Sequence, residues 1–400
     1  MNATSVPSRP CPICSAVVTT VIHHQRFALP PGHPLPTSFD VVACDKCDFV
    51  YADTRAAEAD YDRYYGEYSK YSDQTTATGG GGNFEDKVRI EATAKNIAEH
   101  LTDLATFVVD VGCANGGLLA ELRKLGYTNL LGIDPSSQCV ENTRSLFGIP
   151  AAQGWLRDVP HEAVPAGLVI LAHVMEHILD LKDAVSRLRN MLAPGGMVYV
   201  EVPDASRYLD YLAAPFQDFN TEHINHFCPE SLGNLFLQNG FEQVLSSRKT
   251  FPLPGGKHYP ACYAIFRRSD AVPSACPLDR APAAIVAIKA YVAASSDLLD
   301  RINDRLSSTL QSPVIVWGVG QLALKLLVET LLANAEIVAF TDGNPLHHGG
   351  ELRGVPVISP QALRDLPSHP IIIASLLHQE AIAHRIVKEL QLTNPIITLV

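Results

Sequence analysis

Short apolar runs alternate with amphipathic segments over residues 83–268. A run such as 107–111 is typical of a buried parallel strand, and residues 137–147 have the apolar spacing of a helix. This alternation predicts a doubly wound, Rossmann-like α/β sheet. Residues 241–248 and 262–267 predict an antiparallel pair at its edge. The other expected elements are strands at 129–133, 168–172 and 197–202 and helices at 84–104, 117–125 and 181–192.

A second, shorter α/β pattern covers residues 311–400, after a connector and a long amphipathic helix over 269–310. Its glycine turn, Gly318-Val319-Gly320, has only two of the glycines of GxGxxG, so independent NAD binding is not expected. The pattern predicts a C-terminal Rossmann-like domain that is not a copy of the first. Its strands are expected at 314–317, 336–341 and 371–375, and its first helix at 322–332.

The chain before residue 83 follows neither pattern. Residues 1–57 are rich in proline, and a loop-rich segment this short is expected to lack its own core and to need a staple. Residues 58–82 contain clustered tyrosines and end in four consecutive glycines, which is typical of a mobile lid or a linker.

Two CxxC pairs supply a candidate staple, with the spacing C-x2-C-x29-C-x2-C. Two such turns can place four thiolates around one tetrahedral Zn²⁺, and four thiolates leave no open position for catalysis. A chance pairing of buried cysteines or a redox CxxC are the alternatives. Neither pair follows a strand and opens a helix, as a redox pair usually does. The predicted zinc ligands are Cys11, Cys14, Cys44 and Cys47.

Composition narrows the class of protein. The chain has 400 residues, 47% of them apolar and 18% charged, so it is expected to fold into several domains. A net charge of -11 argues against binding a nucleic acid polymer. We expect a soluble cytoplasmic protein, because the sequence shows no apolar run of membrane-spanning length and no signal-like N-terminus, and its cysteines suit a reducing compartment.

A glycine-rich turn follows the strand at 107–111. Gly112 and Gly116 let the backbone turn sharply and approach a ligand, although the spacing is neither GxGxxG nor a P-loop. Asp134 ends the next strand about 20 residues on, where an acid can accept both ribose hydroxyls or can begin a helix. Asp110 either accepts hydrogen bonds from the loop or faces an ammonium group.

These residues resemble class I S-adenosylmethionine (SAM)-dependent methyltransferases over 84–266. The matching pieces are Asp110 to Gly116, Gly132-Ile133-Asp134, Ala172 to His177 and Leu192 to Gly196. For Glu176 and His177 a structural role is expected, and Trp155 either fills the core or contacts the adenine. The resemblance implies that the methionine portion lies by Asp110, Gly112, Ala114 and Gly116, the ribose by Asp134, the adenine by Gly154, Trp155 and Leu156, and the sulfonium by His173.

The segment 219–227 carries the candidate acceptor site. With the zinc module and the C-terminal domain, it makes nearly the whole chain resemble the deoxysugar C-methyltransferase family. That resemblance implies a nucleotide-linked 4-keto sugar as acceptor and Glu222 and His223 in proton abstraction. The family's enzymes often have a tyrosine where Asn220 stands here. An enolate formed next to the carbonyl needs hydrogen-bond donors, and the candidates are Asn220, Asn225 and His226.

Two further hypotheses remain open. The methyl group can go to an oxygen or nitrogen of another natural-product acceptor, for which no enolate is needed. The third hypothesis is a non-catalytic binding protein with a structural zinc site and an inactive cofactor fold. The C-terminal domain either helps to hold a nucleotide, with Lys325 and His378 facing its diphosphate, or is a scaffold. We expect a monomer or a homodimer.

Overall fold

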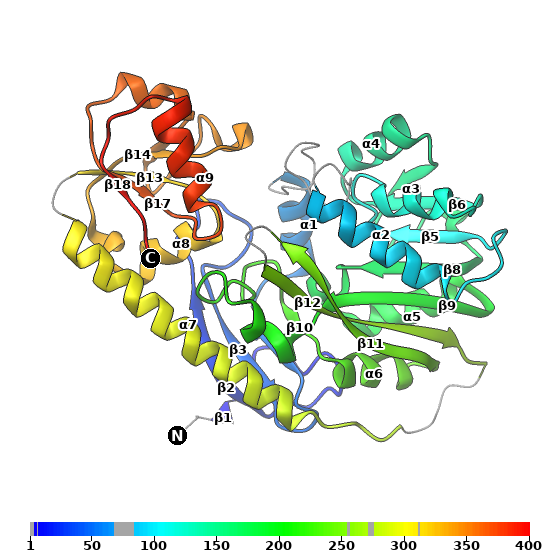
Figure 1. The fold of residues 1–400 in the computed structure, drawn as a ribbon. Coiled ribbons are helices and arrows are strands. Elements are labelled where there is room, and N and C mark those ends of the chain that lie inside the picture. Colours follow the sequence, from blue (N-terminus) through cyan, green and yellow to red (C-terminus); the bar gives the residue numbers. More distant parts are fainter. Residues whose placement is uncertain (1–3, 6, 68–83, 254–256, 271–275, 311–312) are drawn as a thin grey trace. The chain divides into compact units, whose positions relative to one another are not determined.

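The computed structural model describes residues 4–5, 7–67, 84–253, 257–270, 276–310 and 313–400 (Figure 1). The chain divides into two compact units, and neither is continuous in sequence. The first unit consists of Met1–Val21, Val42–Tyr211 and Glu222–Ile288, and the second of Ile22–Val41, Leu212–Thr221 and Lys289–Val400.

A seven-stranded sheet forms the centre of the first unit, in the order β11-β12-β9-β8-β5-β6-β7. The neighbouring strands β9, β8, β5, β6 and β7 are parallel to one another, whereas β12 pairs antiparallel with both β9 and β11. This confirms the predicted sheet and its antiparallel edge. The strands are β5 (Val108–Val111), β6 (Leu130–Asp134), β7 (Ala151–Gln153), β8 (Ala166–Ala172), β9 (Leu192–Pro203), β11 (Phe241–Leu253) and β12 (Lys257–Arg268).

Neighbouring residues of these strands belong to different apolar clusters. Val109 packs in one cluster and Val108 in another, as expected for a sheet that is buried on both faces. Helix α4 shows how local sequence sets an element's ends, since Ser136 caps its first turn and Gly148, with φ +61°, ends it. The helices of this region are α2 (Phe84–Ala98), α3 (Gly117–Lys124), α4 (Ser137–Phe147), α5 (Leu181–Met191) and α6 (Pro229–Leu237).

The N-terminal segment is more ordered than its proline content predicts. It contributes strands to a sheet in the order β1-β2-β3-β4-β10. Phe49 and Tyr51 are fully buried and belong to the same cluster as the core of the seven-stranded sheet. The segment therefore shares a core instead of lacking one. Its strands are β1 (Thr4–Ser5), β2 (Thr19–Arg26), β3 (Ser38–Cys44), β4 (Val50–Asp53) and β10 (Asn225–His226).

Part of the predicted lid is a helix, α1 (Glu58–Glu67). Tyr61 and Tyr64 of this helix are buried, which explains two of the clustered tyrosines as packing residues. Tyr65 of the same helix is half-buried, whereas Tyr68, Tyr71 and the four glycines lie outside the described residues.

The second unit contains a six-stranded sheet in the order β15-β16-β14-β13-β17-β18, with parallel pairing from β16 to β18. This confirms the second Rossmann-like fold. Its elements are β13 (Val314–Trp317), α8 (Gln321–Glu329), β14 (Ile337–Thr341), β15 (Glu351–Leu352), β16 (Val355–Ile358), β17 (Ile371–Ile373), α9 (Gln379–His384) and β18 (Ile396–Ile397).

Helix α7 (Pro282–Thr309) is long and apolar enough to cross a membrane by length and composition alone. Its buried residues recur every three or four positions, however, as in a helix that packs one stripe against a protein core. The stripe includes the polar Ser295. It comprises Ala284, Ile288, Tyr291, Ser295, Leu298, Ile302 and Leu306.

Lys325 corrects one expectation for the second unit. It is 2% exposed, and its ammonium pairs with Glu329 at 2.9 Å and donates to the amide oxygen of Gln25 at 2.6 Å. The ammonium also lies over the ring of Phe216. Lys325 is therefore an internal link between α8 and the N-terminal segment and is not placed to face a diphosphate.

Candidate active site and metal centre

Two similar turns bring four cysteine thiols together. In each turn the residue after the second cysteine, Ser15 or Asp48, donates its N–H to the first cysteine's carbonyl at 2.9 Å. Both residues have left-handed backbone, with φ of +61° and +60°. The four Sγ atoms lie within 4.8 Å of one another, and none is in a disulfide. This geometry suits four thiolate ligands around one metal ion; the residues are Cys11, Cys14, Cys44 and Cys47.

The loop after β5 is the candidate cofactor loop, and it turns through left-handed backbone. Gly112, Ala114 and Gly116 have φ of +77°, +47° and +79°. A β-carbon would lie 2.6 Å from Val174 at position 112 and 2.6 Å from Thr143 at position 116. Glycine is therefore required at both positions, for conformation and for space. A non-glycine residue in left-handed backbone, such as Ala114, is a common feature of ligand-binding loops.

Asp134 ties this loop to the start of α4. Its Oδ2 accepts from the Ala114 N–H and its Oδ1 from the Ser136 N–H, both at 2.9 Å. Ser136 is the helix cap, so capping is not the role of Asp134. Burial raises the pKa of Asp134 to about 6. Each oxygen keeps a second lone pair, so the carboxylate can still accept from ribose hydroxyls.

Asp110 is the strongest sign of a ligand in this loop. It is 3% exposed, and its carboxylate accepts no hydrogen bond from the described part of the chain. Burial and the nearby Asp134 raise the pKa of Asp110 to about 8. A buried acid without donors is costly unless a cation or donor group binds it. The ammonium group of an amino-acid moiety has that chemistry.

The predicted adenine segment follows β7. Gly154 donates its N–H to the Asp134 carbonyl at 3.1 Å, which places the segment beside the ribose candidate. The Arg157 guanidinium lies 4.5 Å from the centre of the Trp155 ring, and Leu156 belongs to the core of the sheet. The structure thus gives Trp155 a protein partner on one face.

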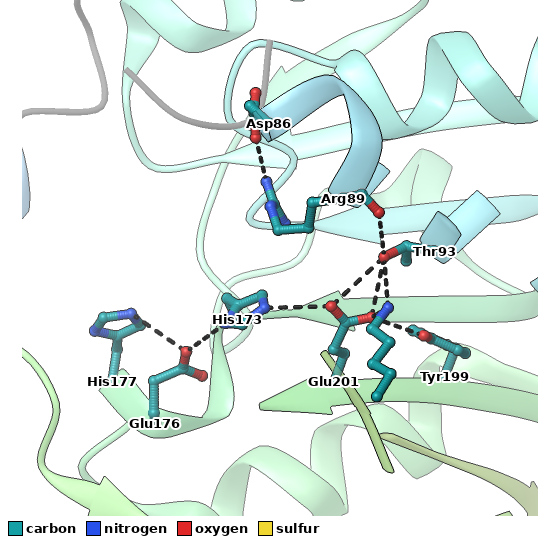
Figure 2. A network of polar contacts seen from close by, with 9 residues as sticks. Asp86, Arg89, Thr93, His173, Glu176, His177, Tyr199 and Glu201 are labelled. Atoms are coloured by element: carbon teal, nitrogen blue, oxygen red, sulfur yellow. Dashed lines mark hydrogen bonds and ion pairs between the residues drawn. The ribbon is translucent and has the colours of Figure 1, made fainter. Parts of the chain in front are cut away.

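A buried polar network begins at the end of β8 (Figure 2). His173 has left-handed backbone, with φ +58°. Its Nδ1 lies 3.3 Å from Glu176 Oε1 and its Nε2 3.2 Å from Glu201 Oε1. Burial by itself lowers the pKa of His173, but the two carboxylates outweigh burial and raise it. His173 therefore links the turn after β8 to β9 through two carboxylates.

Glu201, in β9, is fully buried and surrounded by donors. It forms an ion pair with Lys249 and accepts from the hydroxyls of Tyr199 at 2.7 Å and Thr93 at 3.1 Å. Burial would raise the pKa of Glu201, but Lys249 and His173 hold it well below its usual range. Sequence reasoning missed Glu201 and Lys249, since their positions look like ordinary alternating residues of two strands.

A second cluster joins the turn Met175–His177 to residues 222–224. The Glu222 carbonyl accepts from His177 Nδ1 at 3.1 Å, and the Ile224 N–H donates to the Glu176 carbonyl at 2.9 Å. The rings of His177 and His223 are 4.9 Å apart. The ligand atoms of Glu176, His177 and His223 lie within 4.8 Å of one another. The two imidazoles and one carboxylate thus form a single acid–base group.

This cluster revises the expectation for Glu176 and His177. They form a separate 3₁₀ turn before α5, which begins at Leu181. Asn225 fixes that turn, because its amide donates to the carbonyls of Met175 and Ile178. The Asn225 amide is thereby committed to the fold and is not placed to donate to an enolate.

The other predicted acceptor residues lie in different surroundings. Glu222 is buried. His226 lies in β10, which pairs with β4, and its Nδ1 is 3.3 Å from the Tyr208 hydroxyl. Burial lowers the pKa of His226 to about 3, so it is a neutral internal imidazole. Asn220 belongs to the second unit and donates to the Gln217 carbonyl at 3.3 Å.

Comparison with known proteins agrees with this geometry. Residues 87–246 match a family described as a methyltransferase domain, and residues 310–397 match one described as C2185-like, N-terminal. The first unit therefore contains a methyltransferase domain.

Individual relatives match parts of the chain. The C-methyltransferase NovU of Streptomyces niveus is 34% identical over 36% of this chain and 34% of its own length. The O-methyltransferase cnsE of Penicillium expansum is 25% identical over 55% of this chain and 78% of its own. A solved SAM-dependent methyltransferase of Methanosarcina mazei, 14% identical, covers 44% of this chain and 97% of that one with a TM-score of 0.37. The match to NovU thus spans about a third of that relative.

Proposed function

We propose that this protein transfers a methyl group from SAM to a carbon next to the carbonyl of a nucleotide-linked keto-deoxysugar. The observation that carries the proposal is the acid–base cluster of Glu176, His177 and His223 in the unit that holds the methyltransferase domain. Proton removal from such a carbon needs a positioned base, and imidazole is the usual one near neutral pH. The similarity to NovU, named a C-methyltransferase, supports the choice of carbon.

The cofactor fits the residues of the glycine loop. Asp110 would face the ammonium of the methionine portion, Asp134 the ribose hydroxyls, and Gly112 and Gly116 keep the backbone close. When bound, SAM supplies an electrophilic methyl group. These residues bind and orient it, which is where a protein contributes most in group transfer.

The acceptor chemistry falls to His223. His223 takes the proton on the carbon next to the carbonyl: the C–H bond breaks, an N–H bond forms, and the electron pair spreads onto the carbonyl oxygen. His177, held by the Glu222 carbonyl, fixes the neighbouring imidazole in place. The resulting carbanion would form the new carbon–carbon bond to the methyl carbon as the methyl–sulfur bond of the bound cofactor breaks, and the sulfur would keep that electron pair and leave as a neutral thioether.

His223→Ala should lower methyl transfer by about 10²–10⁴-fold, the usual loss on removing a general base. SAM affinity should stay close to that of the native protein, because His223 makes no predicted cofactor contact. The measurement is proton exchange of a nucleoside-diphosphate-linked 4-keto-6-deoxysugar in deuterated water, followed by methyl transfer. His100→Ala, an exposed histidine, is the control. Normal exchange in His223→Ala would show that another group, such as Tyr65 beside His177, is the base.

A second candidate is O-methylation, favoured by the similarity to cnsE over more than half of the chain. That reaction needs no carbanion. The exchange experiment separates the two, since an O-methyltransferase would transfer the methyl group to its acceptor without exchanging any carbon-bound proton.

We also propose that the four cysteines bind Zn²⁺ as a structural ion. Metal binding at such a site supplies folding free energy. One zinc per chain is expected by metal analysis. Cys44→Ser should lose the metal and lower the thermal midpoint, whereas Cys276→Ser, outside the cluster, should change neither. A metal-free protein with the native thermal midpoint would contradict the proposal.

A further inference from the structure

Glu176 is an unusual carboxylate for its position. It is 1% exposed, and neither of its oxygens accepts a well-aligned hydrogen bond from the described residues. Its closest polar neighbours are imidazole nitrogens: His173 Nδ1 at 3.3 Å and His177 Nε2 at 3.9 Å, both measured to Oε1. Figure 2 shows the carboxylate between the two rings. Buried charges without partners are avoided, so this one calls for a positive group.

The tautomer of His177 indicates where that positive charge can sit. A carbonyl oxygen only accepts hydrogen bonds, so the contact of Nδ1 with the Glu222 carbonyl places a hydrogen on Nδ1. Neutral His177 therefore has its lone pair on Nε2, on the side of the carboxylate. Two electron-rich atoms face each other in that state, and a proton on Nε2 turns the contact into an attraction.

The other side of Glu176 is held by His173, whose pKa is raised by the carboxylates on either side of it, against the effect of burial. His173 lies between Glu176 and Glu201, and Glu201 is neutralised further by Lys249. The backbone N–H of Ile224 holds the Glu176 carbonyl, so the turn cannot move away from residues 222–224 without losing a hydrogen bond. Glu176 is thus fixed in place with one side open to His177.

We propose that the Glu176 carboxylate is the counter-charge for the proton that the His177–His223 pair holds. This makes Glu176 a positioning residue, and it deepens the proposed function, on which its catalytic meaning rests. The proton that His223 takes from the acceptor stays near Glu176 and can be shared with His177. Among the other ionisable groups, Tyr65 lies beside His177, and His173 contacts Glu176 and links it to Glu201 and Lys249.

The test is an NMR titration of the histidine rings in the full-length protein without SAM. Glu176→Gln keeps the shape of the side chain and removes its charge. The proton affinity of His177 or His223 should fall by about tenfold, one pH unit in the titration midpoint. Glu99→Gln, an exposed carboxylate just after α2, should change neither midpoint. Unchanged midpoints in Glu176→Gln would overturn the inference.

Two further measurements keep the test decisive if Glu176→Gln does not fold. Glu176→Asp keeps the charge and should keep the midpoints within half a unit, on the order of a threefold change in proton affinity. In the native protein the ¹³C shift of the Glu176 carboxyl should follow the same midpoint as the imidazole; independent midpoints would overturn the inference. So would a second metal ion per chain that Glu176→Gln loses, because the three groups would then be metal ligands.

The inference and the proposed function can fail separately. A fall in the imidazole midpoint, with no exchange of the keto-sugar proton by the native protein, would support the counter-charge role and reject the acceptor. If both hold, the acidic limb of the exchange rate against pH should move to lower pH in Glu176→Gln, in step with the imidazole midpoint.

Discussion

The two Rossmann-like folds carry nearly the same loop with different chemistry at its base. In the first, Gly112 donates its N–H to the Ile133 carbonyl and Asp134 accepts from the loop N–H of Ala114. In the second, Gly318 donates to the Thr341 carbonyl, and Asp342 accepts from Val319 at 3.0 Å and from Asn344 at 2.8 Å. The acid at the end of the second strand therefore holds the loop in place in both folds.

What differs is the residue two positions before the first glycine. It is the buried Asp110 in the first fold and the fully buried Val316 in the second. The loops also differ in length, since α3 begins five residues after Gly112 and α8 three residues after Gly318. A glycine turn held by an acid such as Asp134 or Asp342 thus indicates a Rossmann-like fold. A buried carboxylate before the turn, such as Asp110, indicates in addition a ligand with a positive charge.

The largest expected effect comes from giving the second loop the acid of the first. Val316→Asp buries a charge among apolar neighbours and should destabilise the second unit by about 4 kcal/mol or more. Val387→Asp, at a half-exposed position of the same unit, should cost less than about 1 kcal/mol. Urea unfolding measures both. If the two variants lose equal free energy of unfolding, position 316 tolerates a carboxylate as well as an exposed position does, and the proposed difference between the two loops is wrong.

The reverse exchange tests the ligand. Asp110→Val should weaken SAM binding by at least about tenfold, the cost of losing a charge-assisted contact. The same variant should gain stability at neutral pH. The pKa of Asp110 is raised, so its ionisation penalises the folded state increasingly as pH rises from 3.8 to about 8. The gain should therefore shrink toward pH 4. Calorimetry measures the change in SAM affinity, and thermal unfolding at several pH values measures the change in stability.

The smallest effect distinguishes the two acids that hold the loops. Asp134→Ala should weaken SAM binding by about tenfold, and Asp342→Ala should leave it unchanged. His347 and two backbone N–H groups outweigh burial and lower the pKa of Asp342, so its contribution to stability is present at neutral pH and is lost on acidification. If Asp134→Ala binds SAM with native affinity, Asp134 only holds the loop in place, as Asp342 does.

Local patterns were enough to predict most of the elements. Residues 137–147 and 314–317 are predicted with the bounds that the structure has, because each has clear periodicity and residues that end it. The antiparallel edge was also predictable. Helix α1 was not, since its tyrosines are buried only by tertiary contacts.

The candidate site could be predicted only in part. The cysteine spacing and the glycine loop are local signals in the sequence. The four cysteines lie together in one cluster, and the glycine loop has the left-handed backbone that its glycines allow. The role of Glu176 depends on His223, 47 residues away in the chain, and no local pattern shows that pairing. The His–Glu spacing of three residues after a buried strand is the one signal that could have drawn attention to it.

The division into units has a consequence for how this protein can be inherited and engineered. The chain passes between the units after residues 21, 41, 211, 221 and 288. No single cut separates them, so neither unit is a cassette that recombination or cloning can move as one stretch. A fragment of residues 289–400 would lack Gln25 and Phe216, which cover the ammonium of Lys325. Exchange of the second unit between relatives would have to transfer three segments together.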